Sequence, residues 1–184
     1  MSNMQPWMLA DTPDEVKIGW RTVTHKTFTL PDGSQEDYTT YGSKRDRSGG
    51  VIALTADNQV IIAEQFRPGP EIVMQELPGG GIEPGEDPQE AALRELREET
   101  GYTSDDVVFL GAVHRDAYMN GTWYYYLARN CRQEHEQDLD HGELIDVRLI
   151  PIEDFIQNAK TGKMSDANAV LIAYDILQAI AREQ

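Results

Sequence analysis

The sequence has little of three things: cysteine, positive charge and long hydrophobic runs. One cysteine, Cys131, among 184 residues excludes an internal disulfide and fits a reducing, cytoplasmic compartment. Lys and Arg number 16 against 32 Asp and Glu, and a formal net charge of −16 repels nucleic acid and anionic membranes. No stretch approaches the ~18 apolar residues of a membrane span, and the start MSNMQPWMLADTPDE lacks the basic and apolar regions of a signal peptide. We therefore expect a cytoplasmic protein that binds neither nucleic acid nor membrane.

The 40% hydrophobic content of the chain is enough for one domain with a small appendage. The residue patterns predict strands over 15–23, 26–30, 37–41, 50–55, 59–66, 107–114, 122–129 and 144–150. A turn is predicted at Pro31-Asp32-Gly33. Strands with helices packed on both sides predict an α/β fold, an α/β/α sandwich around a mixed β-sheet. A charged run, KRDRS, marks the boundary between an N-terminal β-strand extension, residues 1–48, and a main domain, residues 49–184.

Three helices are predicted, over 88–100, over 151–160, and from a capping Ser165 to about Arg182. The apolar face of the last helix is predicted from its spacing to hold Ala167, Val170, Leu171, Tyr174, Leu177 and Ala181.

The most informative segment runs from Gly80 to Tyr102 and reads GGIEPGEDPQEAALRELREETGY. Asp87 is placed to cap a helix that has Pro88 at its first position. Gly101 is placed to end the helix in the left-handed conformation. The segment therefore predicts a well-delimited helix preceded by a glycine-rich loop at residues 79–81.

Three carboxylates share one face of this helix, because Glu95, Glu98 and Glu99 stand at i, i+3 and i+4. Such like-charge neighbours destabilise a bare helix by roughly 0.2–0.5 kcal/mol per pair. A glutamate-rich face is ordinarily a solvated surface. Here Arg94, one turn before Glu98, and the preceding glycines favour instead a site for a hard divalent cation with oxygen ligands.

The spacing of nine positions resembles the signature box of the Nudix hydrolases, G-x5-E-x7-R-E-U-x-E-E-x-G-U with U apolar. These positions are Gly80, Glu86, Arg94, Glu95, Leu96, Glu98, Glu99, Gly101 and Tyr102. Residues 51–102, the C-terminal GKMSDANAVLIAYDIL and the N-terminal strands are similar to the ADP-ribose and nucleoside-diphosphate-sugar pyrophosphatase branch. The resemblance implies an enzyme that uses Mg²⁺, with Mn²⁺ possible, to cleave a nucleoside diphosphate linked to X into nucleoside monophosphate and X-phosphate. It also implies a homodimer in which the N-terminal strands contribute to the partner's substrate site.

The same resemblance implies roles for the residues of the box. It assigns the metal to four residues, which are Gly79 through its carbonyl, Glu95, Glu98 and Glu99. Glu98 is either a further ligand or an organiser of metal-bound water. Arg94 is expected to orient Glu98, and Glu86 is either a structural acid or a secondary contact to the metal.

Outside the box, the resemblance implies that Arg67, which follows a strand, meets the substrate's phosphates; its alternative is a surface arginine at a strand end. Glu76 is expected to bind substrate or a water near the metal. Trp20, like Trp7, lies in the N-terminal extension, where an aromatic ring can stack on a nucleobase or simply pack. We interpret the tyrosines at 124–126 mainly as packing residues.

The general base is expected on the acidic loop before the last strand, over residues 134–143. Glu143 is the first choice because it lies closest to that strand. Asp140 and His141 are its alternatives, since a base must come within hydrogen-bond reach of the attacking water.

The choice of substrate stays open between two classes. ADP-ribose-specific members of the branch carry a proline some fifteen residues beyond the box, and the corresponding stretch here, residues 116–121, has none. A nucleotide sugar is therefore as well supported as ADP-ribose. A hydrolase that sanitises nucleoside triphosphates and a non-catalytic nucleotide-sensing module are the alternative functions.

Overall fold

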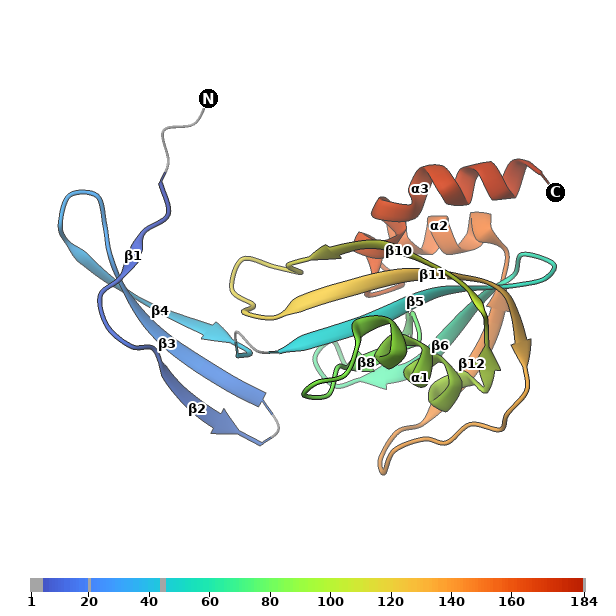
Figure 1. Cartoon of the computed structure of the whole chain (residues 1–184), viewed down its shortest axis with the longest axis horizontal. Coiled ribbons are helices and arrows are strands. Elements are labelled where there is room, and N and C mark those ends of the chain that lie inside the picture. The colour runs from blue at the N-terminus through green and yellow to red at the C-terminus, as the bar shows by residue number, and fades with distance from the viewer. Residues whose placement is uncertain (1–4, 20, 44–45, 184) are drawn as a thin grey trace. The chain divides into compact units, whose positions relative to one another are not determined.

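The computed structural model describes residues 5–19, 21–43 and 46–183 and is drawn in Figure 1. The chain divides into two units. Met1–Asp46 together with His114–Thr122 form the first, and Arg47–Val113 together with Trp123–Gln184 form the second. The first unit thus joins the N-terminal strands to a loop that lies far along the chain. Trp20 lies outside the described residues.

The first unit is built around one long strand. Its sheet has four described strands, which are β1 (Met8–Leu9), β2 (Asp14–Ile18), β3 (Arg21–Thr29) and β4 (Gln35–Tyr41). β3 pairs antiparallel with each of the other three. The loop His114–Thr122 joins this unit through a parallel bridge between Tyr41 and Met119.

The strand boundaries in this unit differ from two of the predictions. The sequence predicts a break between residues 23 and 26, but β3 runs unbroken across it. The chain turns earlier, at Gly19, whose φ of 63° suits glycine. β-branched Thr22, Val23 and Thr24 favour a continuous strand instead. The predicted turn at Pro31-Asp32-Gly33 is confirmed, since the N–H of Gly33 donates to the Leu30 carbonyl at 3.0 Å.

The second unit contains the main sheet, an eight-stranded mixed sheet over the described residues. Its central order is β10-β11-β5-β6-β12 (Figure 1). β7 pairs with β6, β8 with β5 and β9 with β11. The strands are β5 (Arg47–Thr55), β6 (Val60–Arg67), β7 (Ile72–Glu76), β8 (Gly79–Gly81), β9 (Tyr102–Thr103), β10 (Asp106–Val113), β11 (Thr122–Gln133) and β12 (Ile145–Ile150).

The glycine segment that the sequence predicts as a loop is strand β8. It pairs antiparallel with β5, with Gly79 opposite Gly50 and Gly80 opposite Gly49. A Cβ on Gly79 would lie 2.3 Å from the Gly49 carbonyl oxygen. The prediction of a loop is wrong because glycine here serves close packing of two strands rather than a turn. The sequence also gave no prediction for β7.

Helices cover both faces of the main sheet, which confirms the α/β/α sandwich. The helices are α1 (Pro88–Thr100), α2 (Ile152–Lys160) and α3 (Ala167–Arg182). Alternate residues of β5 separate two cores: Val51 packs with α1, whereas Ile52 packs with α2 and α3. On β11, Tyr126 and Tyr125 divide in the same way. Over the described residues, each helix is too short or too polar to cross a bilayer.

Helix α3 starts later and turns a different face inward than predicted. Its N-cap position is Asp166 rather than Ser165. Val170 and Leu177 are buried as predicted, but Leu171 is 76% exposed. The other buried positions are Ala169 and Ala173. The predicted face is wrong by about one position, because one residue turns a helix by roughly 100°.

Candidate functional site

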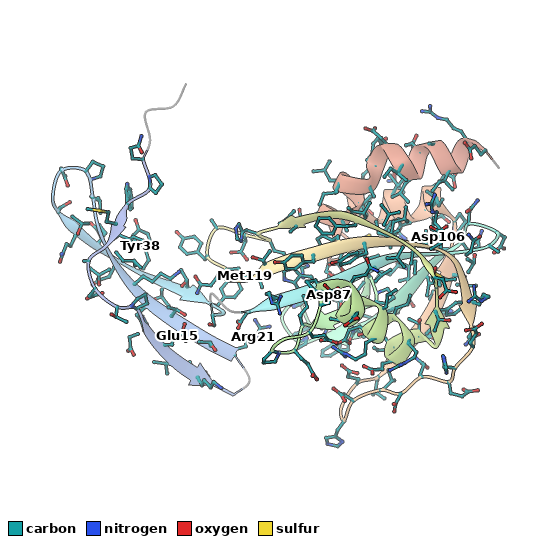
Figure 2. All side chains as sticks on the ribbon, viewed as in Figure 1. Glu15, Arg21, Tyr38, Asp87, Asp106 and Met119 are labelled. Atoms are coloured by element: carbon teal, nitrogen blue, oxygen red, sulfur yellow. The ribbon has the colours of Figure 1, made fainter. Side chains whose placement is uncertain are left out.

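Helix α1 is delimited by local interactions, as the sequence predicts. The Asp87 carboxylate, labelled in Figure 2, accepts from the N–H groups of Gln89 at 2.9 Å and Glu90 at 3.4 Å. Pro88 begins the helix. Gly101 ends it with a φ of 77° and donates its N–H to the Arg97 carbonyl at 2.8 Å. These caps fix which side chains of α1 face strand β8.

Two carboxylates of α1 lie directly against β8. The Gly79 N–H donates to Glu99 Oε2 at 2.9 Å. A Cβ on Gly80 would lie 2.6 Å from the carboxyl carbon of Glu95. The absence of side chains on β8 is therefore what allows these carboxylates to reach its backbone.

Arg94 connects the acids of the box. Its Nε donates to Glu86 at 3.0 Å, and its Nη1 donates to Glu95 at 2.8 Å and to Glu98 at 2.9 Å. Its Nη2 donates to the Gly81 carbonyl at 3.1 Å. These contacts, with Glu86 first, raise the pKa of the Arg94 guanidinium. The sequence predicts only the contact to Glu98, and the others join the helix to the loop before it.

Glu99 is the acid of the site whose negative charge would be least compensated. It is 5% exposed, and no cationic side chain among the described residues forms an ion pair with it. Burial, followed by the negative charges of Glu95, Glu143 and Glu76, raises the pKa of Glu99 to about 8. Burial also raises the pKa of Glu95, although Arg94 opposes this. If all these acids were ionised, their negative charge would exceed what the cationic side chains of the site neutralise.

The donor groups here suit a hard divalent cation, because they are carboxylate and backbone carbonyl oxygens. Within the described chain, no three His, Cys, Asp or Glu side chains are gathered closely enough to enclose a metal ion. Arg94 forms ion pairs with both Glu95 and Glu98. The chemistry of these oxygen donors fits a divalent cation. To bind it, Glu95 and Glu98 would have to contact the cation as well as Arg94.

Arg67 and Glu76, both predicted from the resemblance, lie together on paired strands β6 and β7. Arg67 donates through Nε to Glu76 Oε2 at 2.9 Å and also through Nη2. This hydrogen bonding raises the pKa of the Arg67 guanidinium. Glu76 is 8% exposed and also accepts from Gln65 at 3.2 Å, whereas Arg67 keeps part of its side chain exposed.

The acidic loop, residues 134–143, lies between β11 and β12 and is attached to the C-terminal end of α1. Gln137 Nε2 donates to the Glu99 carbonyl at 2.6 Å, and the Asp138 N–H donates to the Glu98 carbonyl at 2.8 Å. The N–H groups of Glu134 and His135 both donate to the Gly101 carbonyl at 3.1 Å. Sequence reasoning missed Gln137, because a glutamine within a polar loop has no local pattern that marks it.

Glu143 is exposed at the end of this loop, as are Asp140 and His141. The Glu143 carboxylate accepts from the Asp140 N–H at 3.0 Å and so stabilises its own turn. Its charge contributes to the raised pKa of Glu95 and Glu99. The structure therefore places Glu143 within electrostatic range of both carboxylates.

The first unit contains a hollow of about 560 Å³ between its sheet and the loop His114–Thr122. Trp7, Phe28, Tyr38 and Tyr118 supply aromatic surface, and Lys26 and His114 supply polar nitrogen. Figure 2 labels two of the lining residues, Tyr38 on β4 and Met119 on the loop. The Phe28 and Tyr38 rings meet edge to face at 5.9 Å. The hollow is thus walled on several sides by ring faces and edges.

The domain is thus of the α/β/α sandwich class, with a carboxylate-bearing helix packed on a glycine strand. Residues 44–171 match the NUDIX domain family, and the chain belongs to this family, as the box predicts. Hydrolases of the family generally need divalent cations.

Two relatives and one solved structure illustrate the similarity. The chain is 33% identical over 130 residues to a methanol dehydrogenase activator of Bacillus methanolicus, covering 70% of each protein. It is 32% identical over 119 residues to an ADP-ribose pyrophosphatase of Bacillus subtilis (strain 168), covering 64% of each. A crystal structure of an ADP compounds hydrolase superposes with a TM-score of 0.81 over 99% of this chain and 100% of that chain. At 20% identity, this last likeness concerns the fold alone.

Proposed function

We propose that this protein hydrolyses the diphosphate of a nucleoside diphosphate linked to X, either ADP-ribose or a nucleotide sugar. The products are a nucleoside monophosphate and X-phosphate. One observation carries the proposal. Glu95 and Glu99 lie against the backbone of β8, and the positive charge near them is too small to offset the effect of burial, which raises the pKa of both acids. Family membership and the ADP-ribose pyrophosphatase among the relatives support the same reaction.

The metal in this proposal is Mg²⁺, with Mn²⁺ as its substitute, held by Glu95, Glu98, Glu99 and the Gly79 carbonyl. When bound, such a cation supplies charge neutralisation for the diphosphate oxygens and lowers the pKa of water. The Gly79 N–H keeps Glu99 facing β8, and Arg94 holds Glu95 and Glu98 on one side of the helix. These contacts position the acids before any substrate arrives.

Glu143 is the proposed general base that takes a proton from the attacking water, and Asp140 and His141 are the alternatives. The attachment of the acidic loop to α1 through Gln137 and Asp138 supports this, because it ties the loop to the carboxylate helix. An exposed carboxylate on an attached loop can approach a bound water without refolding the domain.

Arg67 is proposed to bind a substrate phosphate. Glu76 is proposed to bind the substrate or a nearby water and, through its hydrogen bonds to Arg67, to orient that guanidinium. The planar guanidinium offers several N–H donors, so pairing with Glu76 leaves others for phosphate oxygens. Its partial exposure supports this role. Trp20, outside the described residues, remains proposed as an aromatic contact to the nucleobase.

The N-terminal extension, residues 1–48, is proposed to form the contact of a homodimer and to complete the partner's substrate site. The aromatic hollow of the first unit supports a part in ligand binding, since rings stack on nucleobases and Lys26 favours anions. The formal net charge of −16 supports small-molecule substrates over nucleic acid and, with the single cysteine, a cytoplasmic location.

The test is a panel of ADP-ribose, nucleotide sugars, dinucleotides and nucleoside triphosphates, incubated with Mg²⁺ and analysed by ion-exchange chromatography. We expect monophosphate and X-phosphate from one of the first two classes. Glu99→Gln should lower turnover by more than about a hundredfold, because even outer partners of metal ligands cost 10–100-fold. Inorganic pyrophosphate as product would favour a triphosphate hydrolase. Tight binding without turnover across the panel would favour a nucleotide sensor.

A further inference from the structure

Asp166 occupies the N-cap position of α3 but does not cap its helix. Its side chain forms no capping hydrogen bond, and the residue is only 4% exposed. Asp87, at the same position of α1, uses its carboxylate for two backbone N–H groups of its own helix. The Asp166 carboxylate is buried and accepts no hydrogen bond from the first N–H groups of α3. Other donors must therefore stabilise it.

The donors include the connection between β7 and β8, strand β11 and the preceding residue. Asp166 Oδ2 accepts from the Leu77 N–H at 3.2 Å and from the Ser165 hydroxyl at 3.0 Å. Asp166 Oδ1 accepts from the Tyr125 hydroxyl at 3.3 Å. Tyr125 is fully buried, and Leu77 is 5% exposed. Because an unsatisfied buried donor costs about 1–3 kcal/mol, these contacts define one arrangement of the three segments.

The Leu77 N–H lies two residues before Gly79. Between them, Pro78 has a fixed φ and gives its carbonyl to the Val51 N–H at 3.0 Å. Gly79 then rests on β5 and donates its N–H to Glu99. A contact at Leu77 is therefore transmitted to Gly79 through a short, stiff segment.

The segment that carries Asp166 is itself attached to the end of β7. The Gln75 N–H donates to the Lys163 carbonyl, and the Ser165 N–H donates to the Gln75 carbonyl, both at 3.2 Å. The Asn158 side-chain amide donates to Gln75 Oε1 at 2.8 Å. The GKMSD sequence thus lies beside the strand that leads into the glycine segment.

We infer that Asp166 is a positioning residue, which acts through the Leu77 N–H to hold β8 where Glu95 and Glu99 meet its backbone. The expected effect on metal binding rests on the proposed function. The positioning of β8 by Asp166 does not rest on it, so the positioning role and the proposed function can fail separately.

The test compares three variants of the full chain. Asp166→Ser keeps a residue that starts helices well, but its shorter side chain does not reach Leu77 and Tyr125. Asp166→Asn keeps the length of the side chain. It can also keep both contacts, because its oxygen can accept from the Leu77 N–H while its amide donates to the Tyr125 hydroxyl. Val170→Ala, one turn further along α3, weakens the same core without touching β8 and serves as the matched control.

Two readouts need no turnover. Amide hydrogen exchange of residues 79–81 should become about tenfold faster in Asp166→Ser, which corresponds to the loss of one or two hydrogen bonds. Mn²⁺ binding, followed by electron paramagnetic resonance, should weaken about tenfold. If the wild type is active, kcat should fall while KM changes little. Asp166→Asn should recover most of each effect, and Val170→Ala should lower only the melting temperature.

The inference is overturned if Asp166→Ser matches Val170→Ala in exchange and in Mn²⁺ binding. If Asp166→Ser does not fold, Tyr125→Phe replaces it. This variant loses one weak hydrogen bond, so the amide exchange rate of residues 79–81 should rise two- to threefold. An exchange rate equal to that of Val170→Ala again overturns the inference. A wild type that hydrolyses nothing in the panel, with exchange still dependent on Asp166, would reject the proposed function and leave the positioning role intact.

Discussion

The carboxylate of Glu95 occupies the space in which any residue but glycine at position 80 would place its side chain. A Cβ there would lie 2.6 Å from both the carboxyl carbon and Oε1 of Glu95. Real Cβ atoms do not approach other atoms so closely, so one of the two must move. Because the atoms it would meet are the flexible end of Glu95, a side chain at position 80 displaces that carboxylate rather than the backbone; Gly80 itself has no left-handed φ.

Gly80→Ala should displace the Glu95 carboxylate and lower kcat by about a hundredfold, because a misplacement of 1 Å can cost that much. The matched control is Gly81→Ala on the same strand, where a Cβ would meet nothing within 4 Å. Steady-state kinetics at saturating Mg²⁺ measure both variants. Equal activity in the two would show that the position of Glu95 does not matter for turnover.

Arg94→Lys should lower kcat by about 10–100-fold, because one ammonium cannot replace a guanidinium that contacts three carboxylates and a carbonyl. Arg97→Lys is the control, since Arg97 is more exposed and, among the described residues, forms an ion pair with Glu98 alone. Both variants keep the net charge. Similar losses of kcat in the two variants would mean that activity depends on positive charge near Glu98, and not on the several hydrogen bonds of the Arg94 guanidinium.

The stability of the metal-free protein should depend on pH through Glu99. Its folded-state pKa is about 8 and its ordinary value is 4.5, so the folded state binds the proton more tightly. Its stabilising contribution is therefore complete below pH 4.5 and is lost as the pH rises through 8. Urea unfolding in the presence of EDTA, from pH 5 to 9, should show wild type losing stability relative to Glu99→Gln.

Added Mg²⁺ should reduce that loss at pH 8–9, because a bound cation favours ionised carboxylates. A pH profile of wild type that runs parallel to that of Glu99→Gln would contradict the buried, uncompensated state of Glu99. No change with Mg²⁺ would contradict its proposed role as a ligand.

The protein should be a dimer at micromolar concentration, with a mass by light scattering of about twice the 20.7 kDa of one chain. Removal of residues 1–46 deletes part of the first unit, so full-length variants of exposed apolar residues are preferable. Ile18→Glu, on the exposed strand β2, should weaken the dimer, and Leu171→Glu on α3 is the control. A monomeric wild type would reject the proposed role of the extension.

Helix α1 and its carboxylate face were predictable from the sequence because the relevant signals are local. Asp87, Pro88 and Gly101 act within a few residues of the helix ends, and the spacing of Glu95, Glu98 and Glu99 fixes a shared face. The sandwich was predictable for a related reason, since continuous apolar runs, as in residues 51–54 and 60–63, put apolar side chains on both faces of a sheet.

The tertiary structure alone decided what these local features contact. The hydrogen bond from Leu77 to Asp166 joins residues 89 positions apart, and that from Tyr125 to Asp166 spans 41. The strand conformation of the glycine segment likewise depends on Gly49 in β5. Such contacts leave no periodic pattern, because the partners become neighbours only when the sheet and the helices have packed together.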